Sequence, residues 1–258
     1  MQQHDARNVL TSIYCQVCIA AFDCARLDVA NECANALKRK FPGSQRVMKL
    51  QAMQLEAMGR FDDALKIYDS LIQRDDTNTS YRKRRAAVFK AQGRTAEAIS
   101  EINDYLKTYM NDNEAWLELA GLYLREQDYS RAAYAMEELL LAQPYNSLYL
   151  QRYADIRYTM GGIESVEVAK QYFVQSAKLN TSNIRALYGV FMSCQWLSQK
   201  TTGQKRKELV ALAQWATDKL IERYAAEIDS NPNNETQVKC IKSMMSALKH
   251  SAKEKEQS

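Results

Sequence analysis

Apolar residues recur along this chain every three or four positions and almost never alternate with polar ones over a strand-length stretch. A spacing of three to four places the apolar side chains on one face of an α-helix. The residues that end helices are scarce, since only eight glycines and three prolines occur in 258 residues. The pattern therefore predicts an all-α protein built from many amphipathic helices.

A small residue returns at a fixed interval within this pattern. Alanines stand 34 residues apart at four positions: Ala30, Ala64, Ala98 and Ala132. Windows at 11–44, 45–78, 79–112 and 113–146 place each alanine in the second of two helices. Helix axes that pack closely lie only about 8–10 Å apart, which favours a side chain no larger than a methyl. These alanines are predicted to be the sites where helices of one unit pack together.

A period of 34 residues is typical of the tetratricopeptide repeat, in which each unit is a helix, a turn and a second helix. Gly59 and Gly93 are also 34 residues apart, where the first helix must end and a positive φ is favoured. The fourth window matches the pattern most fully, with Trp116, Leu119, Ala120, Tyr123, Ala132 and Pro144 at its places. The expected fold is a tetratricopeptide-repeat solenoid of about five to six helix-turn-helix repeats with C-terminal capping helices.

The period slips after the fourth window. A fifth unit starts at Ser147 and has its small packing residue at Ala169, which implies an insertion of three residues near Gly161 and Gly162. The expected organisation is an N-terminal segment (1–10), a solenoid (11–196), a polar loop (197–207), capping helices (208–250) and a flexible tail (251–258).

The first helices of such units line a concave surface, toward which their second, fifth, ninth and twelfth residues point. This rule predicts a partner-binding groove lined by Lys49, Met53, Lys83, Lys90, Leu117, Leu124, Gln151, Asp155 and Tyr158. The mixture of apolar and basic side chains suits an extended or helical peptide. A clamp for acidic chaperone tails is disfavoured, because Met53 and Ala87 replace its asparagines and Glu114 brings a negative charge.

The strongest basic cluster is "YRKRRAAVFK" at 81–90, with Arg82, Lys83, Arg84 and Arg85 in succession. Such a cluster is usually a solvated helix face. Arg82 and Arg85, however, occupy repeat places that are normally apolar, so a partner-binding basic patch is kept as a hypothesis.

Few residues could carry chemistry. The two histidines lie near the ends of the chain, at His4 and His250, and no phosphate-binding glycine loop occurs. Cys15 and Cys18 form a CxxC without a second pair at ligand spacing, and packing explains Cys18 better than zinc does. The sequence predicts no enzyme, no metal and no cofactor.

Charge and hydropathy restrict the surroundings of the protein. The net charge of +4 is too small to suggest nucleic acid as a partner. The longest uncharged run, 8–22, is too short and too polar to span a bilayer. Six cysteines without a regular framework are typical of reduced thiols in the cytosol.

Four stretches (41–72, 77–106, 111–146 and 148–164, the last reading "LYLQRYADIRYTMGGIE") together resemble the family of subunit 2 of the endoplasmic-reticulum membrane protein complex. The resemblance covers roughly residues 12 to 225. It implies a non-catalytic scaffold on the cytosolic face of the endoplasmic-reticulum membrane, within an insertase for tail-anchored and multi-pass proteins. The implied partners are similar to subunits 3 and 5 and to subunit 8 or 9, and these partners, not a transmembrane helix, would hold the chain at the membrane. A soluble co-chaperone and an RNA-binding helical-repeat adaptor stay open as alternatives.

Overall fold

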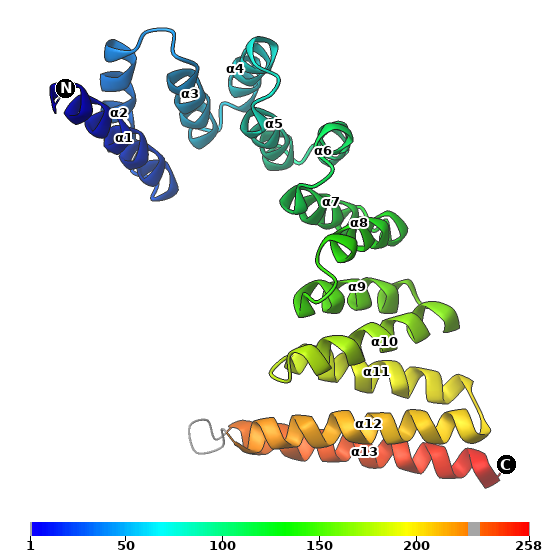
Figure 1. Ribbon diagram of the computed structural model, residues 1–258. Helices are drawn as coiled ribbons and strands as arrows, with labels where there is room; N and C mark the ends of the chain where they lie inside the picture. The colour runs from blue at the N-terminus through cyan, green and yellow to red at the C-terminus, as the bar shows by residue number, and fades with distance from the viewer. Residues whose placement is uncertain (1, 227–232, 258) are drawn as a thin grey trace. The chain divides into compact units, whose positions relative to one another are not determined.

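The computed structural model describes the backbone of residues 2–226 and 233–257 and the side chains of residues 12–226 and 233–250. Within these ranges the chain forms thirteen helices and no strand, which confirms the all-α prediction (Figure 1). The helices are α1 (Gln2–Asp23), α2 (Leu27–Lys40), α3 (Gln45–Ala57), α4 (Phe61–Arg74), α5 (Thr79–Ala91), α6 (Thr95–Thr108), α7 (Asn113–Arg125), α8 (Tyr129–Ala142), α9 (Ser147–Met160), α10 (Ile163–Leu179), α11 (Ile184–Lys200), α12 (Gly203–Ala225) and α13 (Asn233–Gln257).

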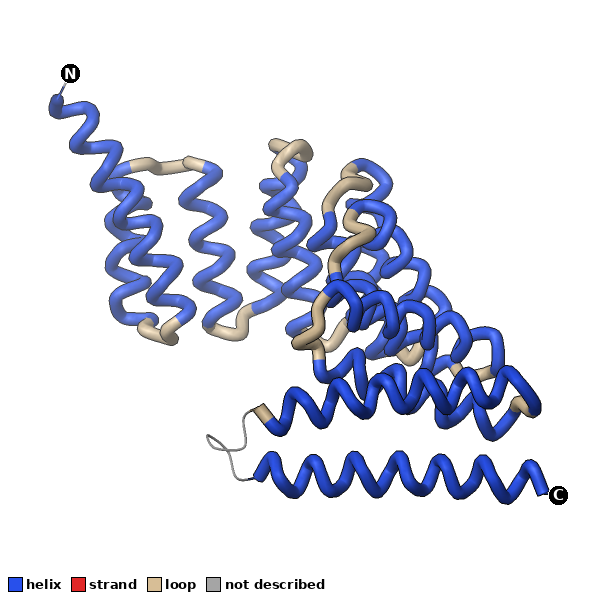
Figure 2. Tube along the Cα trace, turned by 60° about the horizontal axis from the view of Figure 1, so that its bottom comes forward, coloured by secondary structure: helices blue, strands red, loops and turns tan. Residues whose placement is uncertain are grey.

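The helices fall into two compact units, an N-terminal unit (Met1–Ala115) and a C-terminal unit (Trp116–Ser258). In each unit, neighbouring helices run antiparallel and pack as pairs, as the pairs α3/α4 and α9/α10 show (Figure 2). The first helices α3, α5, α7 and α9 begin at residues 45, 79, 113 and 147. These are the predicted starts of four successive repeats, so the predicted register is confirmed.

The alanines of the 34-residue period lie at the centre of this packing. The fully buried set comprises Ala30, Ala64, Ala98 and Ala132, and Ala169 of the fifth unit joins it. Each belongs to the second helix of its pair, as predicted. The CxxC cysteines are packing residues too: Cys15 and Cys18 lie in the core of the N-terminal unit, and the Cys18 thiol donates to the Ala30 carbonyl at 3.6 Å. Burial and the neighbouring thiols of Cys33 and Cys15 raise the pKa of Cys18 to about 11.

The turn between the two helices of a pair has a positive φ at the same place in five repeats. Positive φ angles occur at positions exactly one period apart: Ala25 (56°), Gly59 (73°), Gly93 (74°), Gln127 (58°) and Gly161 (75°). In the first four turns, the next residue's amide donates to the carbonyl five residues earlier, at 2.8 to 2.9 Å. This bond closes a Schellman-type C-cap, which satisfies carbonyls that the helix leaves free. The predicted positive φ at Gly59 and Gly93 is confirmed.

Glycine at position 127 should stabilise the protein, because an L-residue with a β-carbon is strained at this positive φ while glycine is not. We expect Gln127→Gly to raise the free energy of unfolding by about 1 kcal/mol, measured by urea denaturation. The control is Gln92→Gly, since Gln92 ends α5 with an ordinary φ of −75°. That change should be destabilising; an equal gain in both variants would contradict the strain at Gln127.

The three-residue insertion lies elsewhere than predicted. Helix α10 begins at Ile163, in register with the start of α8 at Tyr129, so the turn at Gly161 and Gly162 contains no extra residue. The extra length is in the helix itself, since α10 has 17 residues where α8 has 14. Val166 and Ala169, nearly one turn apart on α10, are both buried.

The predicted polar loop at 197–207 is wrong. Helix α11 continues through Lys200 and α12 begins at Gly203, which leaves only Thr201 and Thr202 between them. The segment is polar in sequence although part of it is buried, since Ser198 and Arg206 are enclosed in the structure. The capping helices accordingly start at 203, before the predicted 208.

The ends of the chain are also more regular than predicted. Helix α1 begins at Gln2, so the segment 1–10 is helical from that residue, and α13 extends through Gln257 where a flexible tail was predicted for 251–258. Residues 1 and 258 lie outside the described residues. The predicted capping face of the last helix is confirmed, since Val238, Ile241, Met245 and Leu248 are all buried.

Candidate functional site

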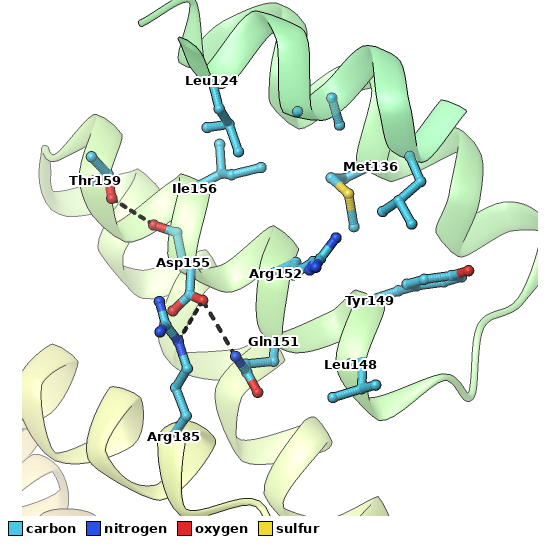
Figure 3. A pocket seen from close by; sticks show the side chains of 13 residues that line it. Leu124, Met136, Leu148, Tyr149, Gln151, Arg152, Asp155, Ile156, Thr159 and Arg185 are labelled. Carbon is cyan, nitrogen blue, oxygen red and sulfur yellow. Dashed lines mark hydrogen bonds and ion pairs between the residues drawn. The ribbon is translucent and has the colours of Figure 1, made fainter. Parts of the chain in front are cut away.

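A groove of about 750 Å³ runs along the first helices of the C-terminal unit (Figure 3). Helix α7 contributes one wall and α9 the other, while single residues come from α8 and α11. The lining residues are Leu117, Ala120, Gly121, Leu124, Met136, Leu148, Tyr149, Gln151, Arg152, Asp155, Ile156, Thr159 and Arg185. Ala120 and Gly121 are the small residues among those that α7 contributes.

One end of the groove is polar and organised around Asp155. Its carboxylate oxygen Oδ2 accepts from Arg185 Nε at 3.0 Å and from Gln151 Nε2 at 3.4 Å, and its backbone carbonyl accepts from the Thr159 hydroxyl at 2.8 Å (Figure 3). Gln151 is held from the other side by Asn183, whose amide donates to Gln151 Oε1 at 2.8 Å. The charge of Arg185 is therefore neutralised within the groove.

The other end is apolar and carries one isolated cation. Met136, Leu148 and Tyr149 lie around the Arg152 side chain, and Leu124 and Ile156 lie nearer to Thr159 and Asp155 (Figure 3). Among the described residues, Arg152 has no carboxylate within ion-pair distance, and its side chain is exposed. An unpaired guanidinium beside apolar side chains can bind a carboxylate, which it recognises through two parallel N–H groups.

The predicted lining is divided between the two units. The groove brings together Leu117, Leu124, Gln151 and Asp155, whereas Lys49, Met53, Lys83 and Lys90 belong to the N-terminal unit. The prediction that Met53 lines a groove is wrong, because this residue is only 5% exposed and packs in the core. Tyr158 packs against the core of the C-terminal unit and is not among the lining residues.

Several lining residues escaped the sequence analysis. Tyr149, Arg152, Ile156 and Thr159 on α9 lie at the third, sixth, tenth and thirteenth places of that helix, one past the predicted places. The side of α9 that lines the groove is therefore wider than the rule predicts. A signal was present in the sequence, since residues 148, 152, 156 and 159 follow helical spacing on one face.

The predicted basic patch is largely neutralised. Lys83 pairs with Asp112 at 2.6 Å and Glu114 at 3.1 Å. Arg84 pairs with Glu56 at 3.2 Å, and Arg85 pairs with Asp69 at 2.7 Å and Glu101 at 2.5 Å. Arg82 is partly buried. The cluster therefore binds neighbouring helices of its own unit to one another.

The ion pair with Lys83 also lowers the pKa of Asp112. Burial works against ionisation of Asp112, but hydrogen bonds from Lys83, from the Tyr105 hydroxyl and from the Ala115 amide hold its pKa below the usual value. Lys83 is consequently engaged and does not offer a free charge to a chaperone tail.

Paired helices, left-handed turns at a 34-residue spacing and a groove along the first helices define a tetratricopeptide-repeat protein. In fold, the chain is similar to the C-terminal part of a TPR repeat-containing protein from Cytophaga hutchinsonii, with a TM-score of 0.61 and 13% identity over 91% of this chain and 95% of that one.

The sequence narrows this class to one family. Residues 39–170 match the EMC2 TPR-like repeat domain. ER membrane protein complex subunit 2 of Xenopus tropicalis is 45% identical over 92% of this chain and 80% of its own length. The subunit of the same name from Dictyostelium discoideum is 34% identical over 80% of this chain and 67% of its own length. The chain belongs to the family of ER membrane protein complex subunit 2.

None of the helices in the described part of the chain is both long enough and apolar enough to cross a membrane.

Proposed function

We propose that this protein is a non-catalytic scaffold subunit of the ER membrane protein complex, placed on the cytosolic face of the endoplasmic-reticulum membrane. There it holds cytosolic segments of the membrane-spanning subunits and supports insertion of tail-anchored and multi-pass proteins. The observation that carries the proposal is the groove of the C-terminal unit, in a chain that is 45% identical to a protein named as subunit 2 of that complex.

The proposed partners are membrane proteins similar to subunits 3 and 5 and a soluble protein similar to subunit 8 or 9. The groove of a helical-repeat protein is long and contains pockets for individual side chains. Such a groove can bind an extended segment of a larger subunit. Attachment to the membrane runs through these partners. Permanent complexes of this kind bury more than about 2,000 Å² at their interfaces, so the complex should survive mild detergent.

The test is to tag the C-terminus, solubilise the membranes in mild detergent and identify the proteins that co-purify in stoichiometric amount. We expect several multi-pass endoplasmic-reticulum proteins together with one soluble partner. A tagged, unrelated tetratricopeptide protein processed in parallel controls for nonspecific binding of membrane proteins.

Two other outcomes would overturn the proposal. Recovery of soluble chaperones alone would identify a co-chaperone, and salt-sensitive recovery of RNA would identify an RNA-binding adaptor. Neither alternative is favoured by the geometry, because Lys83, Arg84 and Arg85 are already paired with carboxylates.

A further inference from the structure

The repeat period relates pairs of residues that link one first helix to the next. The fifth residue of a first helix stands opposite the second residue of the following one. In the N-terminal unit, Lys49 Nζ donates to Ser80 Oγ at 3.1 Å and Lys83 Nζ donates to Glu114 Oε2 at 3.1 Å. These two polar links are 34 residues apart.

The same two places are linked again in the C-terminal unit. Gln151 is the fifth residue of α9 and Arg185 is the second residue of α11, and both donate to the same Oδ2 of Asp155. The link here is made through a shared carboxylate instead of directly. Each pair of successive first helices is one step, so α3, α5, α7, α9 and α11 form four steps. Three of the four carry a polar inter-helix link.

The remaining step, from α7 to α9, differs. Its fifth and second residues are Leu117 and Leu148, which cannot form such a link and which both line the groove. Leu148 is 59% exposed and therefore presents a large apolar surface to solvent. The groove has its apolar end at the one step where the polar link is replaced by two leucines.

Arg152 lies one helical turn beyond Leu148 on α9, in the same groove. Because Arg185 is satisfied by Asp155, the positive charge still available in the groove is that of Arg152. Two leucines and one unpaired guanidinium are complementary to a peptide that offers aliphatic side chains and a carboxylate.

We propose that the α7/α9 step of the groove, formed by Leu117, Leu148 and Arg152, binds a short segment of a partner protein through one Asp or Glu flanked by aliphatic side chains. The inference rests on the proposed function, since the partner segments are taken to be cytosolic parts of the membrane-spanning subunits. The carboxylate fixes the position of the segment on Arg152, and burial of the aliphatic side chains against the leucines supplies most of the affinity.

The probes are fluorescent synthetic peptides of about 15 residues, tiled over the cytosolic segments of the membrane-spanning subunits from the organism of this chain. Binding to the full purified chain is measured by fluorescence anisotropy. We expect the bound peptides to share an acidic residue next to aliphatic ones. Changing that residue to its amide, or Arg152→Gln, should each weaken binding about tenfold or more, because a hydrogen bond to a charged group is lost. The two changes together should cost little more than either alone.

A second variant restores the missing link. Leu117→Lys with Leu148→Glu copies the Lys83 and Glu114 pair, and a glutamate at 148 also stands four residues before Arg152, where it can pair with that guanidinium. We expect this double variant to fold, as judged by circular dichroism, and to lose peptide binding. Arg223→Gln removes an exposed arginine of α12 that is not part of the groove, and it should bind as the wild type does.

Each contrary result has a distinct meaning. If the wild-type chain co-purifies with the membrane subunits but the Arg152 and leucine variants bind the peptides unchanged, the groove inference fails and the scaffold function stands. The same holds if the bound peptides carry no carboxylate, or if a second copy of this chain occupies the groove in sedimentation experiments. If the wild-type chain does not co-purify with these subunits, the proposed function itself fails.

Discussion

Glu101→Ala should lower the free energy of unfolding by about 2–3 kcal/mol, a large part of the total for a typical domain. Glu101 lies on α6, is 8% exposed and pairs with Arg85 of α5 at 2.5 Å. Removing the carboxylate leaves a largely buried guanidinium with only the half-exposed Asp69 as its partner. The loss of unfolding free energy should be smaller than for a buried charge without any partner, because Asp69 remains beside Arg85. Urea denaturation followed by circular dichroism measures it.

The repeat itself supplies the matched control. One period later, the places of Arg85 and Glu101 are taken by Leu119 and Ala135, both buried. The double variant Arg85→Leu with Glu101→Ala therefore copies an apolar pair that the chain already uses. It should recover most of the stability, since an apolar pair avoids the desolvation of two charges. A double variant as unstable as Glu101→Ala alone would show that the ion pair is not the cause.

Gly189→Ala should destabilise the C-terminal unit by about 1–2 kcal/mol, although alanine is the better helix former. A β-carbon at Gly189 of α11 would lie 2.5 Å from the ring of Phe173, a buried residue of α10. The ring is enclosed in the core and cannot rotate away freely, so the two helices must separate. That cost exceeds the gain in helix propensity, which is about 1 kcal/mol. The measurement is the midpoint of urea denaturation.

Gly121→Ala is the control for this prediction. Gly121 is also within a helix, but no atom lies within 4 Å of a β-carbon placed there. Only the gain in helix propensity remains, so this variant should be stabilised. Phe173→Leu should reduce the penalty of Gly189→Ala by making room. Equal effects of alanine at 121 and 189 would contradict the contact with Phe173.

The regular part of the fold could be predicted from the sequence because its period is carried by residues with a steric role. Ala30, Ala64, Ala98 and Ala132 mark the helix packing, and Gly59 and Gly93 mark two of the turns. Few residue types fit a close helix contact or a positive φ, so these positions can be recognised in the sequence.

Other parts could not be predicted because polar residues occupy buried positions there. Ser198 and Arg206 are polar but buried, so the polar pattern of their segment predicts a loop where the structure has helix. Arg85 stands at an apolar place and indicated a basic surface, whereas its carboxylate partners come from α4 and α6. Partners supplied by a neighbouring helix depend on side-chain directions, which a one-dimensional pattern does not contain.

The predicted groove lining extends over both units, and of its residues Leu117, Leu124, Gln151 and Asp155 line the groove of the C-terminal unit. Lys49 and Lys83 occupy the predicted places, but Lys83 is paired with Asp112 and Glu114, while Lys49 donates to the neutral Ser80 hydroxyl. Arg152, the unpaired cation in the groove, lies one residue past a predicted place. The sequence therefore indicated some of the residues of α7 and α9 that line the groove, whereas the contacts of the side chains decide which charges stay unpaired.

The left-handed turns have a consequence for how repeats of this family are counted. Of the five turn residues, Ala25 and Gln127 are not glycine, yet they share the same backbone angles with Gly59, Gly93 and Gly161. A search profile that scores glycine at this place will miss or underrate two of five units. Aligning relatives by their backbone dihedral angles, and only afterwards by residue identity, should recover degenerate repeats at the ends of such arrays and correct the boundaries assigned to them.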